Sequence, residues 1–171
     1  MACALLSGFA LDCKDVVGGI KNLYIAPLSS VTTVSANASG YVTAITKSGL
    51  FYKYELMPRG ANSFTENIQA DPATGSVAYE PTINVVFSKL AQGNTNKFDL
   101  LAKNRMAIIV ETKDGSFFLA GQYNGMEVNG GTAASGAAMN EFQGYNLTFS
   151  GMEKAMSPEV SPSIIAALLT V

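Results

Sequence analysis

The sequence contains no histidine and no tryptophan, and few of its residues carry charge. Without histidine, the commonest general base and most zinc sites are missing, and Ser–His or Cys–His nucleophile pairs are excluded. No Walker loop or dinucleotide fingerprint occurs, because Gly18-Gly19 and Gly130-Gly131 lack the strand–turn–helix context of those motifs. We therefore expect a non-enzymatic protein with no catalytic, cofactor-binding or metal-binding residues, no cofactor and no small-molecule substrate.

The remaining candidates for chemistry are weak. The 13 acidic residues leave carboxylate pairs of the glycoside-hydrolase kind open, although no aromatic sugar platform stands out. In the segment Asp12–Asp15, Lys14 would favour a thiolate at Cys13 whereas the two aspartates oppose it, so we interpret this segment as a structural turn. Cys3 and Cys13 fit free thiols in a reducing cytoplasm better than a disulfide, and their redox state stays open.

Charge and hydrophobic runs are also scarce. Charged residues make up 14% of the chain, the net charge is −2, and no basic run occurs, so capture of nucleic acid phosphates is not expected. The start lacks the basic region of a signal peptide, and the apolar end, Ser163–Val171, is far shorter than the roughly 20 residues of a membrane span. We expect folding in a cytoplasm without a membrane anchor. So little charge fits either a surface that packs against other protein or a plain soluble β domain.

Period-two alternation of apolar and polar residues recurs along the chain and predicts strands with one buried face. The inward residues are expected to include Ile83, Val85 and Phe87 in one strand, and Tyr145, Leu147 and Phe149 in another. The expected strands are Lys21–Ala26, Val31–Ser35, Tyr41–Thr46, Phe51–Met57, Phe64–Ala70, Ser76–Leu90, Met106–Thr112, Ser116–Gly121 and Gly144–Ser150.

One helix is expected, capped by Asn94 or Thr95, with an apolar stripe that includes Phe98 and Leu101. The turn-forming cluster Asp71–Gly75 predicts a long hairpin, and Pro81 predicts an edge or a bend in its second arm. The sequence thus predicts a mainly β fold, an antiparallel β-sandwich or barrel with one flanking α-helix and a long projecting hairpin or loop. We expect one domain over residues 1–171, with an N-terminal arm at 1–19 and a C-terminal arm at 154–171, whose apolar tail after Pro162 docks on a neighbour.

The most informative segment is Gly125–Tyr145, which contains a run of small residues from Asn129 to Ala138. A free loop of this length is unusual in a compact domain unless it binds something or is disordered, and its small side chains let another backbone approach closely. No Lys or Arg occurs between Asp114 and Glu153. If copies form a ring, this region could line its central passage, where its negative charge would keep DNA from binding to the wall. The equal alternative is an ordinary polar loop with too few charges to matter.

Several segments together resemble a known family. They are Asp12–Ile25 as an opening strand, Ser63–Glu66 entering the long hairpin, Leu100–Val110 as a helix-to-strand step, and Gly121–Gly125, the small-residue stretch and Gly144–Glu153 as a closing hairpin. Their order resembles the major tail tube proteins of long-tailed bacteriophages and the related tube proteins of contractile injection systems. The resemblance spans residues 12 to 153 and consists of patterns rather than an invariant motif.

The resemblance implies a virion structural protein, assembled in the bacterial host cytoplasm, whose hexameric rings stack into a tube for DNA. Its partners would be copies of itself and other virion proteins, with DNA only as non-specific cargo. A head–tail connector or neck ring and a capsid-associated protein stay open as alternatives, as do ring symmetry and copy number. From other classes, a ligand-binding module or small hydrolase stays open, and a nucleic-acid-binding domain has little support.

We expect the contacts between copies in two segments, the long hairpin and the small-residue stretch. The expected interface residues are Phe64, Asp71, Pro72, Gly75, Asn129, Gly130, Gly131, Ala133, Ala134 and Gly136.

Overall fold

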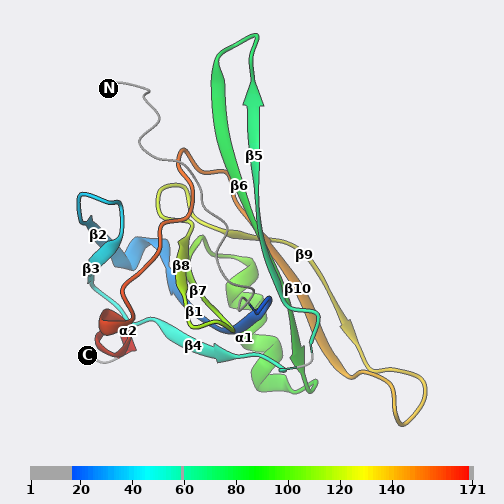
Figure 1. Ribbon diagram of the computed structural model, residues 1–171. Helices are drawn as coiled ribbons and strands as arrows, with labels where there is room; N and C mark the ends of the chain where they lie inside the picture. Colours follow the sequence, from blue (N-terminus) through cyan, green and yellow to red (C-terminus); the bar gives the residue numbers. More distant parts are fainter. Residues whose placement is uncertain (1–16, 59, 170–171) are drawn as a thin grey trace.

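The computed structural model describes residues 17–58 and 60–169 and shows a mainly β protein (Figure 1). Cys3, Cys13 and the segment Asp12–Asp15 lie outside the described residues. The elements are β1 (Ile20–Pro27), the short helix η1 (Leu28–Ser30), β2 (Val31–Ala36), β3 (Val42–Lys47), β4 (Tyr52–Glu55), β5 (Ser63–Asp71), β6 (Ser76–Ser88), α1 (Gln92–Ala102), β7 (Met106–Thr112), β8 (Phe117–Ala120), β9 (Glu127–Ala134), β10 (Gly144–Ser150) and α2 (Pro162–Leu169).

The strands form three antiparallel sheets. Two have four strands each, in the orders β4-β1-β7-β8 and β5-β6-β10-β9, and the third is the β2–β3 hairpin. The architecture is a sandwich of sheets rather than a closed barrel, which confirms the predicted mainly β class. The neighbouring strands β7 and β8 are joined by the Asp114-Gly115 turn, as predicted from the sequence.

The sheet β4-β1-β7-β8 is the central layer, because its strands bury side chains on both faces. Leu23 and Ile108 pack toward the sheet β5-β6-β10-β9, whereas Tyr24 and Ile109 pack toward the β2–β3 hairpin and α2. Burial on both faces explains why β7 is apolar almost throughout rather than alternating.

The sheet β5-β6-β10-β9 is buried on one face only. The inner residues of β6 and β10 are those predicted from alternation: Ile83, Val85, Phe87, Tyr145, Leu147 and Phe149 are all buried. Pro81 lies within β6 rather than at an edge strand. The Pro81 carbonyl accepts a hydrogen bond of 3.3 Å from the N–H of Gly151, which lies just past the end of β10. Pro81 is therefore beyond the paired part of β6 and β10, and its lack of an N–H removes no hydrogen bond between these two strands.

Helix α1 packs on the sandwich through Phe98 and Leu101, as predicted. The predicted cap is wrong: α1 begins after Ala91 without a side-chain cap. Thr95 instead places its hydroxyl 2.6 Å from that of Tyr145, which ties the helix to β10.

A second helix, α2, follows where the sequence indicated a C-terminal arm. Its residues Ile165 and Leu168 are buried in the cluster on the far face of the central sheet. Just before it, Val160 forms a parallel bridge with Val42, and Glu159 pairs with Phe118. This end of the chain therefore packs on its own domain.

Candidate assembly surface

The most distinctive surface is the outer face of the sheet β5-β6-β10-β9, here called the polar face. Residues directly opposite each other in neighbouring strands point to the same face, so the register assigns its members. They are Ser63, Thr65, Asn67, Gln69, Asp71, Ser76, Ala78, Glu80, Thr82, Asn84, Val86, Ser88, Glu127, Gly130, Thr132, Ala134, Gly144, Asn146, Thr148 and Ser150. Nearly all are small or neutral polar residues.

Hydrogen bonds between side chains connect the strands across this face. The Thr148 hydroxyl donates to Asn84 Oδ1 at 2.7 Å, and Asn84 Nδ2 donates to Ser63 Oγ at 3.5 Å. Closer to the tip of the hairpin, Gln69 Nε2 donates to Glu80 Oε2 at 2.6 Å. Some of the polar side chains thus bond to one another across the strands, and the face carries no long basic side chain.

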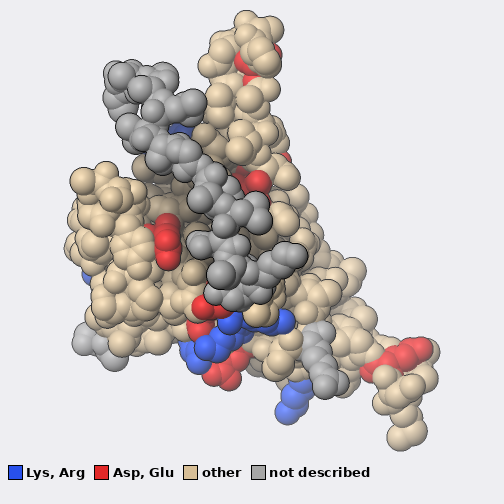
Figure 2. Space-filling model, in the orientation of Figure 1, with Lys and Arg blue, Asp and Glu red and all other residues tan. Residues whose placement is uncertain are grey.

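None of the four strands contains Lys or Arg, although they carry Glu66, Asp71, Glu80 and Glu127. The Ala73 N–H and the Thr74 hydroxyl hydrogen-bond to Asp71 and hold the pKa of its carboxyl below the ordinary value, so it stays ionised at neutral pH. Figure 2 shows acidic side chains on the projecting hairpin, while the basic side chains lie on the body of the domain. The polar face is therefore neutral to acidic.

Among residues 17–58 and 60–169, both edges of this sheet are open, since β5 and β9 each pair on one side only. β9 is exposed from Asn129 to Ala134 and carries neither Lys nor Pro, two devices that protect edge strands from pairing. Its two glycines differ. A Cβ on Gly131 would lie 2.6 Å from the Asn146 carbonyl oxygen, so β10 requires glycine there, whereas a Cβ on Gly130 meets nothing within 4 Å.

The two open edges are offset along the strand direction. β5 pairs with residues 76–84 of β6, whereas β9, through β10, is level with residues 82–88. The offset lets the β5–β6 hairpin project from one end of the domain and the β9–β10 hairpin from the other (Figure 1). A staggered sheet of this kind is what a ring of tilted strands requires.

Nine of the ten predicted interface residues fall into two separate groups. Asp71, Pro72 and Gly75 lie at the exposed tip of the β5–β6 hairpin, where Gly75 adopts φ 67°. Asn129, Gly130, Gly131, Ala133 and Ala134 lie on β9, and Gly136 lies in the turn that follows.

A single chain does not bring these two groups together. The expected loop over Asn129–Ala138 is wrong, because residues as far as Ala134 form a strand with β10. Phe64 lies at the base of the hairpin, where its ring stacks on Phe118 with centroids 6.2 Å apart.

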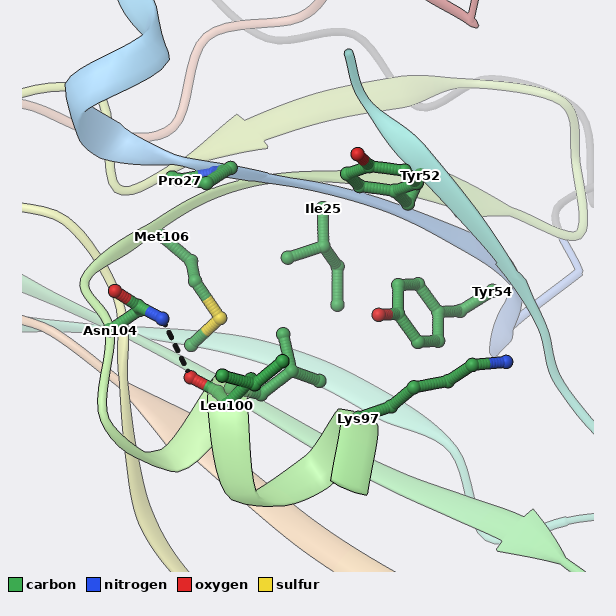
Figure 3. A pocket seen from close by; sticks show the side chains of 9 residues that line it. Ile25, Pro27, Tyr52, Tyr54, Lys97, Leu100, Asn104 and Met106 are labelled. Carbon is green, nitrogen blue, oxygen red and sulfur yellow. Dashed lines mark hydrogen bonds between the residues drawn. The ribbon is translucent and has the colours of Figure 1, made fainter. Parts of the chain in front are cut away.

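Sequence reasoning missed an apolar cleft of about 360 Å³ between α1 and the strands β1 and β4 (Figure 3). Tyr52, Tyr54 and Ile25 lie on one side, and Leu100 on the other. Burial, with a smaller effect from Tyr52, raises the pKa of Tyr54, so its hydroxyl stays neutral. No sequence pattern predicts this cleft, because the residues that line it come from three separate segments of the chain.

The buried carboxylates are used for structure. Glu153 accepts the N–H groups of Tyr123, Asn124 and Gly125 at 2.9–3.3 Å and so holds the turn before β9. Glu111 accepts from Asn22 at 2.7 Å and from Tyr24 at 2.8 Å and pairs with Lys21 at 2.7 Å. The acceptors of both carboxylates are engaged by their own domain.

Within residues 17–58 and 60–169, no three metal-ligating side chains converge on one point. No helix in the same ranges is long and apolar enough to cross a membrane. Comparison of the chain with protein-family models, with curated proteins and with solved structures gives no match. The geometry of the polar face and its two edges is therefore the basis for a functional proposal.

Proposed function

We propose that this protein is a virion structural subunit that assembles with copies of itself into rings, which stack into a phage tail tube through which DNA passes. The observation that carries the proposal is the polar face, a sheet surface without Lys or Arg that lies between two open edges. The resemblance of the sequence patterns to those of tail tube proteins also motivates the proposal.

The strand directions support closure of a ring by the sheet itself. Each of the four strands is antiparallel to its neighbour, so β5 and β9 run in opposite directions. Rotation about a ring axis then places β9 of one copy antiparallel to β5 of the next, and the alternation continues around the ring. A closed ring leaves no unpaired edge, which satisfies amide groups that are exposed in the monomer.

The charge of the polar face supports its orientation toward the passage. Lys and Arg bind DNA phosphates with an affinity that depends on salt and would retain DNA at the wall. A wall of Thr, Asn, Ser and Gln with a few carboxylates lets DNA slide without such attachment. DNA is then cargo, and the binding partners are copies of the same chain and other virion proteins.

The experiment places a basic residue on the polar face. The variant Thr82→Lys/Thr148→Lys and the control Thr43→Lys, on exposed β3, are assembled with duplex DNA and examined by native mass spectrometry, electron microscopy and nuclease protection. We expect wild type and control to form rings that do not shield DNA. We expect the polar-face variant to shield DNA in a manner that weakens as salt rises.

Two outcomes contradict the proposal. A wild-type protein that stays monomeric at every concentration tested rules out the ring. Rings of the polar-face variant that leave DNA as sensitive to nuclease as the control does would show that this face does not line the passage.

A further inference from the structure

The sequence contains two Asn-Gly pairs, Asn124-Gly125 just before β9 and Asn129-Gly130 within it. An asparagine followed by glycine can lose ammonia without an enzyme, because glycine has no side chain to hinder the attack of its own amide nitrogen on the asparagine side chain. The reaction needs an asparagine side chain that can turn and a glycine amide that can reach it. The structure holds one of the two pairs in place and leaves the other free.

Asn124-Gly125 is held by the turn that precedes β9. The Asn124 Nδ2 atom donates a hydrogen bond of 2.6 Å to the Met152 carbonyl, and the Gly125 N–H donates one of 3.1 Å to Glu153 Oε1. Gly125 is also buried. The amide nitrogen that would attack is therefore engaged by a carboxylate, and the side chain that it would attack is fixed.

Asn129-Gly130 lies at an irregularity in β9. Thr148 of β10 pairs with Gly130, and Phe149 pairs with Val128, so Asn129 is an extra residue without a partner in β10. A bulge of this kind disrupts the ladder locally and leaves the added residue unpaired. Both Asn129 and Gly130 are exposed, and none of the residues that the structure describes forms a hydrogen bond with the Asn129 side chain.

The surroundings of Gly130 leave room for the reaction. A Cβ at Gly130 would meet nothing within 4 Å, so the Asn129 side chain and water can approach the amide. In the described part of the chain β9 is an edge strand that pairs with β10 alone. An edge strand opens locally more easily than a strand held on both sides, because only one ladder has to break. The bulge can therefore adopt the reactive geometry without unfolding of the domain.

We propose that Asn129 is a site of spontaneous deamidation in the unassembled protein. The Gly130 amide nitrogen gives its proton to a base in the solvent and bonds to Asn129 Cγ; the bond from Cγ to Nδ2 breaks, and Nδ2 takes up a proton and leaves as ammonia. Water then opens the succinimide ring. Cleavage between the nitrogen and Cγ gives aspartate, whereas cleavage between the nitrogen and the main-chain carbonyl carbon gives isoaspartate, whose main chain runs through Cβ and Cγ. Either product has a new carboxylate.

The consequence for assembly rests on the proposed function. In the proposed ring, β9 of one copy lies beside β5 of the next, and β5 carries Glu66 and Asp71 but no Lys or Arg. A new carboxylate on β9 then meets charge of the same sign, which disfavours pairing. Isoaspartate also lengthens the main chain of β9 and disturbs the ladder. Pairing with β5 in turn holds Asn129 from both sides, so copies within a ring are protected, whereas free copies gradually lose the ability to join.

The first measurement follows the reaction in the unassembled protein. The chain is kept dilute in mildly alkaline buffer and then cleaved after glutamate, which separates the two Asn-Gly pairs because Glu127 lies between them. Mass spectrometry gives the extent of deamidation at each asparagine, and an isoaspartyl methyltransferase labels isoaspartate. We expect Asn129 to react at least about tenfold faster than Asn124, since attack by the Gly125 nitrogen first requires loss of its hydrogen bond to a carboxylate.

Two variants connect the reaction to assembly. Gly130→Ala hinders the attack while its methyl group meets open space, so deamidation should slow several-fold in a folded protein. Asn129→Gln keeps an uncharged amide but would have to close a larger ring, so it should not react measurably. Each protein is compared with itself before and after incubation, by native mass spectrometry of ring formation. Wild type should lose ring formation in proportion to deamidation at Asn129, and Asn129→Gln should retain its own level.

Two results would overturn the inference. Deamidation of Asn129 no faster than that of Asn124, or as fast in Gly130→Ala as in wild type, would show that the bulge is not the reactive site. Protein converted at Asn129 that joins rings as readily as fresh protein would show that the modification does not control assembly. Failure of fresh wild type to form rings would instead refute the proposed function, and the deamidation of the free chain would stand without it.

Discussion

The two four-stranded sheets differ in how far the rest of the domain covers their faces. The sheet β4-β1-β7-β8 is covered by its own domain, with buried side chains on both faces. Its Glu111 is paired with Lys21 and accepts hydrogen bonds from Asn22 and Tyr24. The sheet β5-β6-β10-β9 is enclosed on one face over its middle only, and both of its ends project. The described residues therefore cover both faces of the first sheet, whereas the second keeps one uncovered face and has strands β5 and β9 that each pair on one side only.

The largest expected effect is a difference in folding stability between replacing a buried isoleucine and replacing an exposed one. Ile108→Ala removes a fully buried side chain from β7 and should lower the free energy of unfolding by about 2–5 kcal/mol. Ile68→Ala, on the exposed hairpin, should change it by less than about 0.5 kcal/mol. Urea denaturation of the unassembled protein measures both. Equal losses would break the distinction between the two sheets.

A smaller effect separates the two neighbouring glycines of β9. Gly131→Ala places a methyl group against the Asn146 carbonyl and the Leu147 side chain, and should cost about 1–3 kcal/mol of folding stability. Gly130→Ala meets open space and should be nearly neutral for folding. Thermal unfolding of each variant tests this. If Gly130→Ala is the more destabilising of the two, the assigned faces of β9 are wrong.

The smallest expected effect is on the pH dependence of folding stability, and it comes from Glu111 in the sheet β4-β1-β7-β8. Burial raises the pKa of Glu111, but hydrogen bonds from Lys21, Asn22 and Tyr24 outweigh it and hold that pKa below its ordinary value of 4.5. A carboxyl group whose pKa is lower in the folded than in the unfolded state stabilises the protein at pH values above its unfolded-state pKa. This stabilisation is lost as the pH falls through the folded-state pKa.

Denaturation at a series of pH values therefore should show stability declining below about pH 4.5, as unfolded Glu begins to bind protons. The decline should be shallower in Glu111→Gln, which cannot ionise. An identical pH profile in wild type and Glu111→Gln would contradict the role assigned to this carboxylate.

Much of the fold could be predicted because its signals are local. Alternation located the inner residues of β6 and β10, and the Asp-Gly turn located the β7–β8 hairpin. The failures have tertiary causes. Small residues from Asn129 to Ala134 have weak strand propensity by themselves, and pairing with β10 makes them a strand. The apolar end of the chain lies over the central sheet as α2, which its composition alone did not indicate.

The candidate surface shows the same division. Its chemical character could be predicted, since the absence of Lys and Arg from Asp114 to Glu153 is a property of the sequence. The sequence could not show that β5 and β6 share this property and join the same polar face, because that depends on pairing between distant strands. The cleft lined by β1, β4 and α1 could not be predicted from the sequence for the same reason.

The sequence by itself determined which residues alternate, where the hairpins turn, and that histidine chemistry is absent, because these depend on nearest neighbours and composition. Only the tertiary structure decided which strands pair, which sheet is covered on both faces, and that two edges left open by the described residues flank one polar face. Those properties arise from contacts between segments far apart in the chain. No local pattern of residues encodes their distance or order in space.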